Sequence, residues 1–333
     1  KRQEHLKIKG EIPAGSNEPV TLEENVAARI FTGAPVPSGA DTVVMQEKVS
    51  VKDGYLAIND ENLQLGNNVR VRGAEIKAGS LALEKDCYLS AAAIGFLAGT
   101  GVSKVAVYSK PLVSIIVTGK ELQQPGKPLH YGQVYESNSF SLAAALKQLH
   151  FTDMRITEVD DDPGKLKSVL KDALLQSDMV LLTGGISVGD YDYVLQATTA
   201  CTVTNLFHKV KQKPGKPLFF GMKEKKPVFG LPGNPASVLT CFYEYVVPAL
   251  EKLCNRKNLS KIIKAPLAKS FQKKAGLTHF LKGWYANNRV TLLDAQESYR
   301  LSSFAKANCL VRIDEAITSC EEGEMVAINI LPI

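Results

Sequence analysis

Between residues 111 and 255, short apolar runs alternate with helical patterns, and no other feature of the chain limits its fold as strongly. Residues 112–118, LVSIIVT, form a nearly continuous apolar run, which is typical of a strand buried on both faces of a sheet. The patterns predict further strands at 154–159, 179–182 and 228–231, and helices at 139–150, 163–176 and 236 to about 253. This order predicts an α/β central domain with a doubly wound, mostly parallel sheet.

The segments on both sides of the central domain have β-rich patterns. Residues 49–58 alternate around Asp53-Gly54, a strong signal for a type I′ hairpin. Residues 21–30 begin with the capping-box pattern TLEE and predict a helix. Short strands are expected at 43–45 and 105–108, and alternating strands after residue 255 predict a small barrel or sandwich.

These patterns divide the chain into four expected domains. A helix at 91–98, capped by Ser90, lies in a segment that links the first domain to the central one. The expected boundaries are a β-rich N-terminal domain at 1–72, whose start lies before residue 1, a linking domain at 73–108, the α/β domain at 109–255 and a C-terminal β-barrel-like domain at 256–333.

Composition excludes several classes of protein. The net charge of +6, from 40 basic and 34 acidic residues, is too small and too dispersed for a nucleic-acid-binding protein. The six cysteines contain no CxxC pair and the five histidines are scattered, so a zinc enzyme is not expected. No apolar run approaches the ~20 residues of a membrane span. Free thiols in apolar runs favour a reducing, cytoplasmic compartment.

Three glycine-rich loops follow predicted strands of the central sheet. They are 118–122, TGKEL, then 183–192, TGGISVGDYD, and 231–237, LPGNPAS. Ligands of open α/β sheets bind at the carboxyl ends of the strands, and glycines let backbone N–H groups approach an anion closely. Each loop alone is explained by a tight turn, but three on one edge favour a site for a phosphate-bearing ligand. Its candidate residues are Gly184, Gly185, Ser187, Gly233 and Asn234.

Lysines and carboxylates lie close to these loops in the sequence. Lys209, Lys211 and Lys213 alternate, so they are expected on one face of a strand, followed by Lys216. Either they form a solvated charge run or they clamp a phosphate or oxyanion; composition leaves both open. Acidic residues cluster at loop ends, which suggests Mg²⁺ bridging phosphates. They are Glu121, Asp160, Asp161, Asp162, Asp190 and Asp192, of which Asp162 before Pro163 is typical of a helix N-cap.

Long motifs in the same order resemble a known family. LTGGISVGDYDY at 182–193, KQKPGKP at 211–217 and FGLPGNPAS at 229–237 are similar to those of the MoeA and gephyrin E-domain family of molybdopterin molybdenumtransferases. The resemblance extends over almost the whole chain, through GEIPAG at 10–15, ARIFTGAPVPSGADTVVMQE at 28–47, VRGAEIKAGS at 71–80, TGKEL at 118–122, ESNS at 136–139 and QESYRLSSFAKAN at 296–308.

The resemblance implies an activity and an assembly. A member of this family takes adenylylated molybdopterin, inserts molybdate and releases AMP in a Mg²⁺-dependent step. It forms an elongated homodimer of four-domain chains whose active site lies near the dimer interface, where residues 73–108 would take part in dimerisation and 109–255 would bind molybdopterin. The substrates are small molecules, a transient contact with the adenylylating enzyme of the pathway is expected, and neither nucleic acid nor membrane is involved.

The resemblance also implies roles for single residues. Glu121, Asp161, Asp192, Lys209, Lys213 and Thr32 match catalytic positions, with Glu121 and Asp192 as metal ligands. Lys216, Ser298, Lys282 and Glu75 join the glycine-loop residues in binding the substrates. Glu75 stands where the family more often has Asp, and Lys282 and Leu277 stand where it usually has Arg. The family's SAMDGYA-type motif is expected before residue 1.

Two other functions stay open at this point. The central domain alone would suit an ATP-dependent molybdopterin adenylyltransferase, although the flanking β-rich domains argue against it. A non-catalytic scaffold relative of the family is the second alternative. The sequence does not distinguish molybdate from tungstate as the anion.

Overall fold

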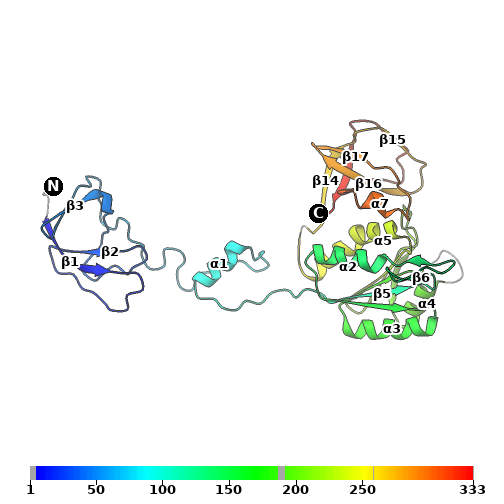
Figure 1. Cartoon of the computed structure of the whole chain (residues 1–333), viewed down its shortest axis with the longest axis horizontal. Coiled ribbons are helices and arrows are strands. Elements are labelled where there is room, and N and C mark those ends of the chain that lie inside the picture. Colours follow the sequence, from blue (N-terminus) through cyan, green and yellow to red (C-terminus); the bar gives the residue numbers. More distant parts are fainter. Residues whose placement is uncertain (1–4, 187–191, 258, 333) are drawn as a thin grey trace. The chain divides into compact units, whose positions relative to one another are not determined.

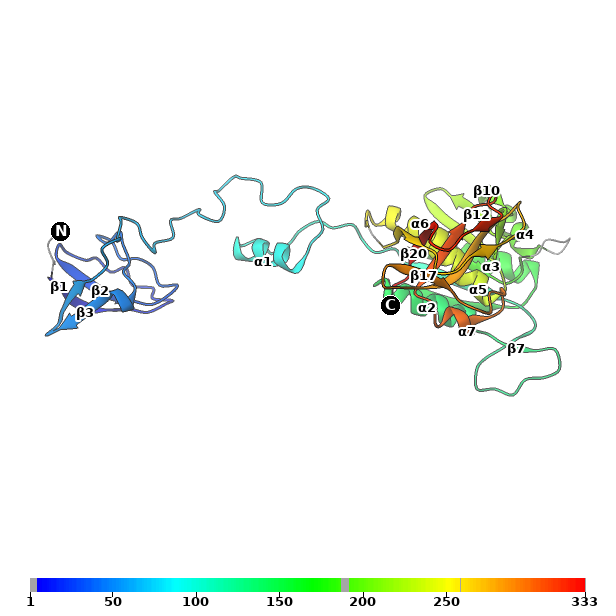
Figure 2. The same ribbon diagram turned by 90° about the horizontal axis from the view of Figure 1, so that it is seen from above.

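The computed structural model describes residues 5–186, 192–257 and 259–332. The chain divides into two compact units, Lys1–Ser103 and Lys104–Ile333 (Figures 1 and 2). No helix in the described part of the chain has the length and apolar character needed to cross a membrane. All six cysteines are free thiols, in agreement with the sequence analysis.

The first unit is built on a four-stranded sheet with the order β2-β1-β4-β3. Asp53 and Gly54 have φ of 49° and 78°, so the expected hairpin is confirmed with both turn residues left-handed. Further along, the Ser90 hydroxyl accepts a hydrogen bond from the Ala93 amide, 3.2 Å away, and caps α1 as expected. The elements are β1 His5–Ile12, β2 Val26–Ile30, the 3₁₀ turn Gln46–Lys48, β3 Val49–Lys52, β4 Tyr55–Ile58 and α1 Ala91–Gly99.

The helix predicted at 21–30 is wrong. Val26–Ile30 is strand β2, and its pairing with β1 is parallel, with Lys7 opposite Val26. Asn25 has φ of 61°, which interrupts a helical path directly after the TLEE pattern. The pairing with a distant strand therefore overrides a local capping signal, and β-branched ends favour the strand.

The two short strands predicted at 43–45 and 105–108 are also wrong. The 43–45 segment is a loop tied to another loop, because the Val43 amide donates to the Asn67 carbonyl at 3.0 Å. The 105–108 segment joins no ladder in the described chain, and Val107 is 65 % exposed. An apolar run without a neighbouring strand to pair with stays extended but irregular.

The second unit contains the predicted doubly wound α/β domain. Its six-stranded sheet has the order β10-β12-β13-β9-β5-β8, in which β13, β9, β5 and β8 are parallel neighbours and β12 and β10 form an antiparallel edge. The strands are β5 Val113–Thr118, β8 Met154–Val159, β9 Met179–Thr183, β10 Thr204–His208, β12 Phe219–Lys223 and β13 Lys226–Leu231. The antiparallel strands were not predicted from the sequence.

Helices cover both faces of this sheet (Figure 1). Ile115 of β5 packs in a core with α2 and α5, whereas Ile116 packs in a second core with α3 and α4. The helices are α2 Asn138–Gln148, α3 Pro163–Gln176, α4 Tyr193–Ala200, α5 Pro235–Cys241, a π-helical turn Phe242–Val246 and α6 Val247–Leu253. The last three together form the single long helix predicted after residue 236. Asp162 caps α3 as expected, accepting from the Lys165 amide.

A β-rich domain completes the second unit, as predicted. Its main sheet has the order β11-β16-β18-β20-β14, with β17 on β16, and β11 comes from the α/β domain. Pairing of β11 with β16 therefore joins the two domains. The elements are β11 Gln212–Lys213, β14 Lys261–Pro266, β15 Phe271–Gln272, β16 Thr278–Ala286, β17 Arg289–Leu292, α7 Leu301–Phe304, β18 Cys309–Ile313, β19 Ser319–Cys320 and β20 Met325–Ile330; β6 Leu122–Gln123 pairs with β7 Val134–Tyr135 in a surface loop.

Candidate active site

The chain order of the parallel strands places a switch point between β5 and β9. The strands follow one another as β5, β8, β9 and β13 but lie side by side as β13-β9-β5-β8. Ligands of doubly wound sheets bind where the order reverses, outside the carboxyl ends of the strands. Two of the three glycine-rich loops leave the two strands that flank this point, and the third follows β13.

The glycines of the loop after β9 are required by packing. Gly184 has φ of 82°, and a Cβ there would lie 1.8 Å from the Thr118 carbonyl oxygen. Gly185 has φ of 62°, and its Cβ would lie 2.8 Å from Thr118 Cγ2. Gly233 lies next to Gly184, since its Cβ would be 3.9 Å from the Gly184 Cα. The three loops therefore converge on one small region, where side chains at these positions would block the approach of the backbone.

Asp161 ties the end of β8 to the loop after β5. Its Oδ1 accepts from the Thr118 hydroxyl at 2.5 Å, and its Oδ2 accepts from the Lys120 amide at 3.2 Å. Both carboxylate oxygens are thereby engaged in fixing the TGKEL loop. Glu121 in the same loop is exposed, so its carboxylate faces solvent.

Asn138, at the start of α2, links two of the glycine-rich loops through its side-chain amide. Its Nδ2 donates to the Thr183 hydroxyl at 3.0 Å and to the Gly233 carbonyl at 2.9 Å. The side chain is buried, and its Oδ1 has no hydrogen-bond partner among the described residues. Residue-by-residue reasoning missed this position, although the ESNS motif at 136–139 was a signal for it.

The C-terminal domain contributes Ser298 to the same edge. Asn234 Nδ2 donates to the Ser298 hydroxyl oxygen at 2.9 Å, and the Ser298 carbonyl accepts from the Ala236 amide at 3.0 Å. Two candidate residues that are 64 positions apart in the chain are therefore in direct contact. The structure thus brings Asp161, Gly184, Gly233, Asn234 and Ser298 into one connected series.

Asp192 is buried at the N-terminus of α4, where its Oδ1 accepts from the Leu195 amide at 2.9 Å. Its Oδ2 lies 3.2 Å from His208 Nε2, and neither atom has a well-formed hydrogen bond. In this conformation the carboxylate caps a helix and contacts an imidazole. Ser187 and Asp190, in the preceding segment, lie outside the described residues.

The prediction that Lys209, Lys211 and Lys213 share one face of a strand is wrong. Strand β11 includes Gln212 and Lys213 alone, and Lys209 has φ of 67°. The segment folds back on itself, since the Lys209 amide donates to the Leu218 carbonyl at 2.9 Å and the Val210 amide to the Lys216 carbonyl at 2.8 Å. We call residues 209–218 the lysine loop; all four of its lysines are exposed.

Comparison with known proteins identifies the family. Residues 1–101 match the MoeA N-terminal region (domain I and II), residues 114–252 a probable molybdopterin binding domain and residues 264–331 the MoeA C-terminal region (domain IV). A molybdopterin molybdenumtransferase of Haemophilus influenzae is 32% identical over 331 residues, which cover 97% of this chain and 82% of that protein. The chain belongs to the molybdopterin molybdenumtransferase family. 

Further relatives agree with this family assignment. A molybdopterin molybdenumtransferase of Staphylococcus epidermidis is 36% identical over 92% of this chain and 72% of that protein. The crystal structure of a molybdopterin biosynthesis MoeA protein from Pyrococcus horikoshii superposes with a TM-score of 0.82, at 30% identity, over 98% of this chain and 81% of that one. The MoeA architecture, an α/β domain with β-rich flanking domains, is therefore confirmed.

Lys282 of this MoeA relative does not face open solvent. The side chain is buried, and its ammonium donates to the carbonyls of Ala295, Arg300 and Glu297 at 2.7, 3.2 and 3.4 Å. Burial lowers the pKa of this lysine. All three N–H donors bind carbonyls of the segment 295–300, so Lys282 holds the loop that carries Ser298 from its buried side.

Thr32 and Glu75, the two other residues assigned through the MoeA resemblance, belong to the first unit. Thr32 lies in a turn and Glu75 in a loop, and both are exposed. The roles of all these residues remain predictions. Among the residues with described positions, no three His, Cys, Asp or Glu side chains come together as a metal site.

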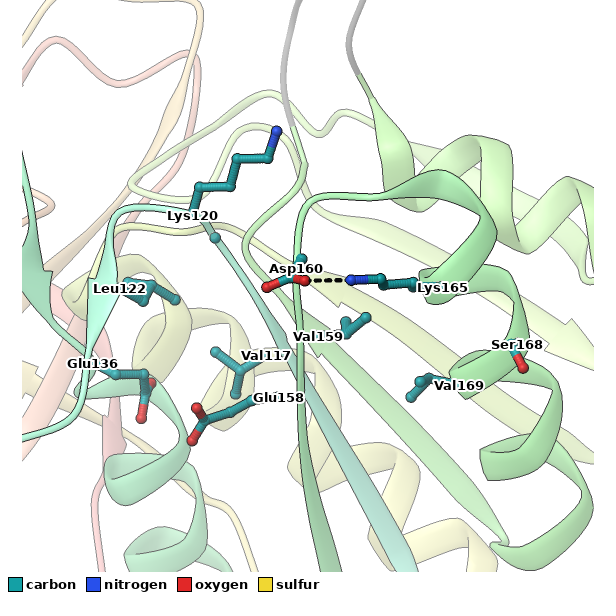
Figure 3. A pocket seen from close by; sticks show the side chains of 11 residues that line it. Val117, Lys120, Leu122, Glu136, Glu158, Val159, Asp160, Lys165, Ser168 and Val169 are labelled. Atoms are coloured by element: carbon teal, nitrogen blue, oxygen red, sulfur yellow. Dashed lines mark hydrogen bonds and ion pairs between the residues drawn. The ribbon is translucent and has the colours of Figure 1, made fainter.

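A cavity of about 550 Å³ lies beside the predicted site, on the β8 side of the β5 end. Lys120, Glu136 and Asp160 line it with Lys165 (Figure 3), so the cavity includes part of the predicted TGKEL loop and one of the clustered acidic residues, Asp160. Asp160 and Lys165 form an ion pair at 2.6 Å, and this hydrogen bond lowers the pKa of Asp160. The cavity thus borders the switch point along the TGKEL loop, whereas Gly184, Gly233 and Ser298 are not among its described lining residues.

Proposed function

We propose that this chain inserts molybdate into adenylylated molybdopterin and releases AMP. The observation that carries the proposal is the convergence of the glycine-rich loops with Ser298 at the switch point of the sheet. Membership of the molybdopterin molybdenumtransferase family supports the same reaction. Both a phosphate-bearing pterin and a tetrahedral oxyanion would find backbone N–H groups and hydroxyls there.

The lysine loop supplies positive charge for the proposed reaction. Cleavage of a phosphoric anhydride develops negative charge on phosphate oxygens, and nearby lysines stabilise it. Lys209, Lys213 and Lys216 are exposed on one closed loop, and Lys213 lies opposite His279 of the C-terminal domain in the ladder. We assign the contact with the substrate phosphates to this loop.

We further propose that Mg²⁺ enters with the substrate phosphates. Mg²⁺ keeps several waters and is held by one or two carboxylates together with phosphate oxygens. The exposed Glu121 fits such a role. Asp192 fits it less well in this conformation, because one of its oxygens caps α4 and the other lies against His208. Mg²⁺ would neutralise charge on the phosphates that the lysines also contact.

We also propose that the protein works as a homodimer in the cytoplasm, with a transient contact to the adenylylating enzyme. The strongest support for a dimer is α1, an apolar helix without a single buried residue. Ile94 on this helix is 56 % exposed, and Tyr88 just before it is 80 % exposed. An apolar surface of this kind is typical of a protein interface, and a second copy of the chain is the partner that we propose.

One experiment tests the reaction directly. The protein is mixed with adenylylated molybdopterin, Mg²⁺ and molybdate, and AMP is followed with time. AMP release that requires molybdate supports the proposal. Consumption of ATP with unadenylylated molybdopterin would instead identify an adenylyltransferase, and binding without turnover would identify a scaffold. Replacing molybdate by tungstate in the same assay determines which anion is used.

A further inference from the structure

The lysine loop is held from its inner side by a buried glutamine. Gln212 is 2 % exposed, and its Nε2 donates to the carbonyls of Pro214 and Gly215 at 3.1 and 3.3 Å. One amide group thereby binds two consecutive carbonyls of the turn that joins Lys213 to Lys216. The turn cannot change shape without breaking these bonds.

The same glutamine also binds the continuous helix formed by α5 and the π-helical turn that follows it. The Tyr245 hydroxyl donates to Gln212 Oε1, and Gln212 Nε2 lies 3.5 Å from Cys241 Sγ. The turn packs so closely on this helix that a Cβ at Gly215 would lie 2.6 Å from the Cys241 sulfur. The glutamine side chain thus bridges the turn and the helix, with all its polar atoms satisfied.

Tyr245 stands in the π-helical turn Phe242–Val246. Such turns widen a helix by one residue and often occur at functional sites. Burial raises the pKa of Tyr245 to about 12, so the hydroxyl keeps its proton and acts as the donor at physiological pH. The hydrogen bond from Tyr245 therefore persists over the whole range in which the protein would work.

A buried polar pair needs a reason, because two apolar side chains would fill the same space without the penalty of desolvation. Here the pair joins the helix to a loop that carries exposed lysines at both ends of its turn. We propose that Gln212 and Tyr245 are positioning residues that hold the lysine loop in register and so determine the affinity for the phosphate-bearing substrate. The part concerning affinity rests on the proposed function.

Two variants test the proposal in the full chain, with a matched control. Tyr245→Phe removes the donor to Gln212, and Gln212→Met removes both ends of the bridge at similar side-chain length. Tyr243→Phe is the control, because Tyr243 is a buried tyrosine of the same helical turn that packs on Phe242 and Phe304. Thermal midpoints are measured for all three, and each assay is run well below the lowest midpoint.

The first readout needs no substrate. Trypsin cleavage after Lys209 and Lys211 is followed by mass spectrometry, and we expect Tyr245→Phe to speed it about 5- to 100-fold while Tyr243→Phe leaves it unchanged. Nuclear magnetic resonance of His279 is a second measure, because burial and then the charges of Lys273 and Lys213 lower its pKa. Displacement of Lys213 would move that pKa back toward its ordinary value.

The second readout is kinetic. We expect the KM for adenylylated molybdopterin to rise about 5- to 100-fold in Tyr245→Phe while kcat stays within about twofold, since the reacting groups are untouched. Loosening of the loop in a protein without any AMP release would refute the proposed reaction and keep the positioning role. Unchanged cleavage and an unchanged KM in Tyr245→Phe, or equal effects in Tyr243→Phe, would overturn the positioning role itself.

Discussion

The two units of the chain differ in how much apolar surface each one buries. In the described part of the first unit, Ile12 and Leu22 are the buried hydrophobic side chains, and α1 buries none of its residues. The second unit has three hydrophobic cores, two of them on opposite faces of the α/β sheet. Elements with few buried contacts open more readily, so we expect the first unit to open more readily than the second.

The same contrast applies to chemistry. The connected series from Asp161 to Ser298 lies entirely in the second unit, where buried strands set the positions of the loops. Thr32 and Glu75, in the first unit, are exposed residues of turns and loops. We conclude that a dense core positions the connected series of candidate residues, whereas Thr32 and Glu75 belong to a unit that buries little apolar surface.

The largest expected effect is on the stability of the second unit. Phe242→Ala removes a fully buried ring and should lower the free energy of unfolding by about 3–5 kcal/mol. Leu22→Ala in the first unit should cost no more than about 2 kcal/mol, because its surroundings can collapse more easily. The only tryptophan, Trp284, reports the second unit in fluorescence-monitored urea unfolding. Far-UV circular dichroism follows both units, and equal losses of unfolding free energy in the two variants by this measure would remove the difference between the units.

A second prediction concerns assembly by the first unit. Ile94→Asp places a charge on the apolar helix α1 and should convert the proposed dimer to a monomer, since a buried unpaired charge strongly opposes association. Ile262→Asp, at a 66 % exposed position of the second unit, is the control and should leave the dimer intact. Sedimentation velocity at micromolar concentration distinguishes the two. A dimer that survives Ile94→Asp would exclude α1 from the interface.

The third prediction concerns Asp192 and separates its two roles. Asn is as good an N-cap as Asp, so Asp192→Asn should keep the thermal midpoint near that of the wild type, whereas Asp192→Ala should lose about 1 kcal/mol of stability. If the charge is used in catalysis, both variants should slow AMP release by at least ~100-fold. AMP release and the thermal midpoint of Glu75→Gln, a variant in the first unit, are measured in the same experiments. Normal turnover by Asp192→Asn would leave capping as the only role of Asp192.

A smaller effect is expected from single lysines of the lysine loop. Lys213→Ala would remove the proposed charge-assisted hydrogen bond to the substrate, which is worth roughly 1.5–3 kcal/mol, and should weaken binding of the adenylylated pterin about 10- to 150-fold. Lys211 is the control, because it lines a separate hollow with Glu244, Tyr245 and Arg312. Its replacement by alanine should have much less effect. Equal small losses in both variants that disappear in moderate salt would indicate only a screened surface charge.

The smallest expected effect is a change in the pH dependence of stability. Burial raises the pKa of Glu244, and the hydrogen bond from Asn329 and the charge of Arg312 offset this only in part. A carboxyl whose pKa is higher in the folded state contributes full stability below its unfolded pKa and loses that contribution as pH rises through its folded pKa. Glu244→Gln should therefore flatten the decline in unfolding free energy as pH rises above the ordinary pKa of a glutamate. An unchanged profile would assign this decline to other groups.

The sequence predicted much of the second unit because the signals there are local. The apolar run at 112–118, the one-sided helix at 163–176 and the cap at Asp162 all depend on residues within a few positions of each other. The hairpin at Asp53-Gly54 was confirmed for the same reason. The predicted edge of glycine-rich loops was also confirmed as an arrangement, because carboxyl ends of parallel strands must lie on one edge.

What failed, or could not be predicted, depends on partners far along the chain. The 21–30 segment became a strand because β1 pairs with it. The lysine loop folds back because the Leu218 and Lys216 carbonyls accept hydrogen bonds from the amides of Lys209 and Val210. Gln212 receives its hydrogen bond from Tyr245, 33 residues away. Lys282, which the family resemblance placed among the substrate-binding residues, donates its hydrogen bonds to three backbone carbonyls.

The sequence by itself therefore determined the fold class, the two kinds of domain and the loops that gather at the sheet edge. The tertiary structure decided which charged and polar side chains face solvent and which are buried with internal hydrogen-bond partners. Glu121 is exposed, whereas Lys282 is buried. The physical reason is that periodicity and caps are properties of neighbouring residues. Burial of a polar group, in contrast, depends on whether packing brings a hydrogen-bond partner from elsewhere in the chain.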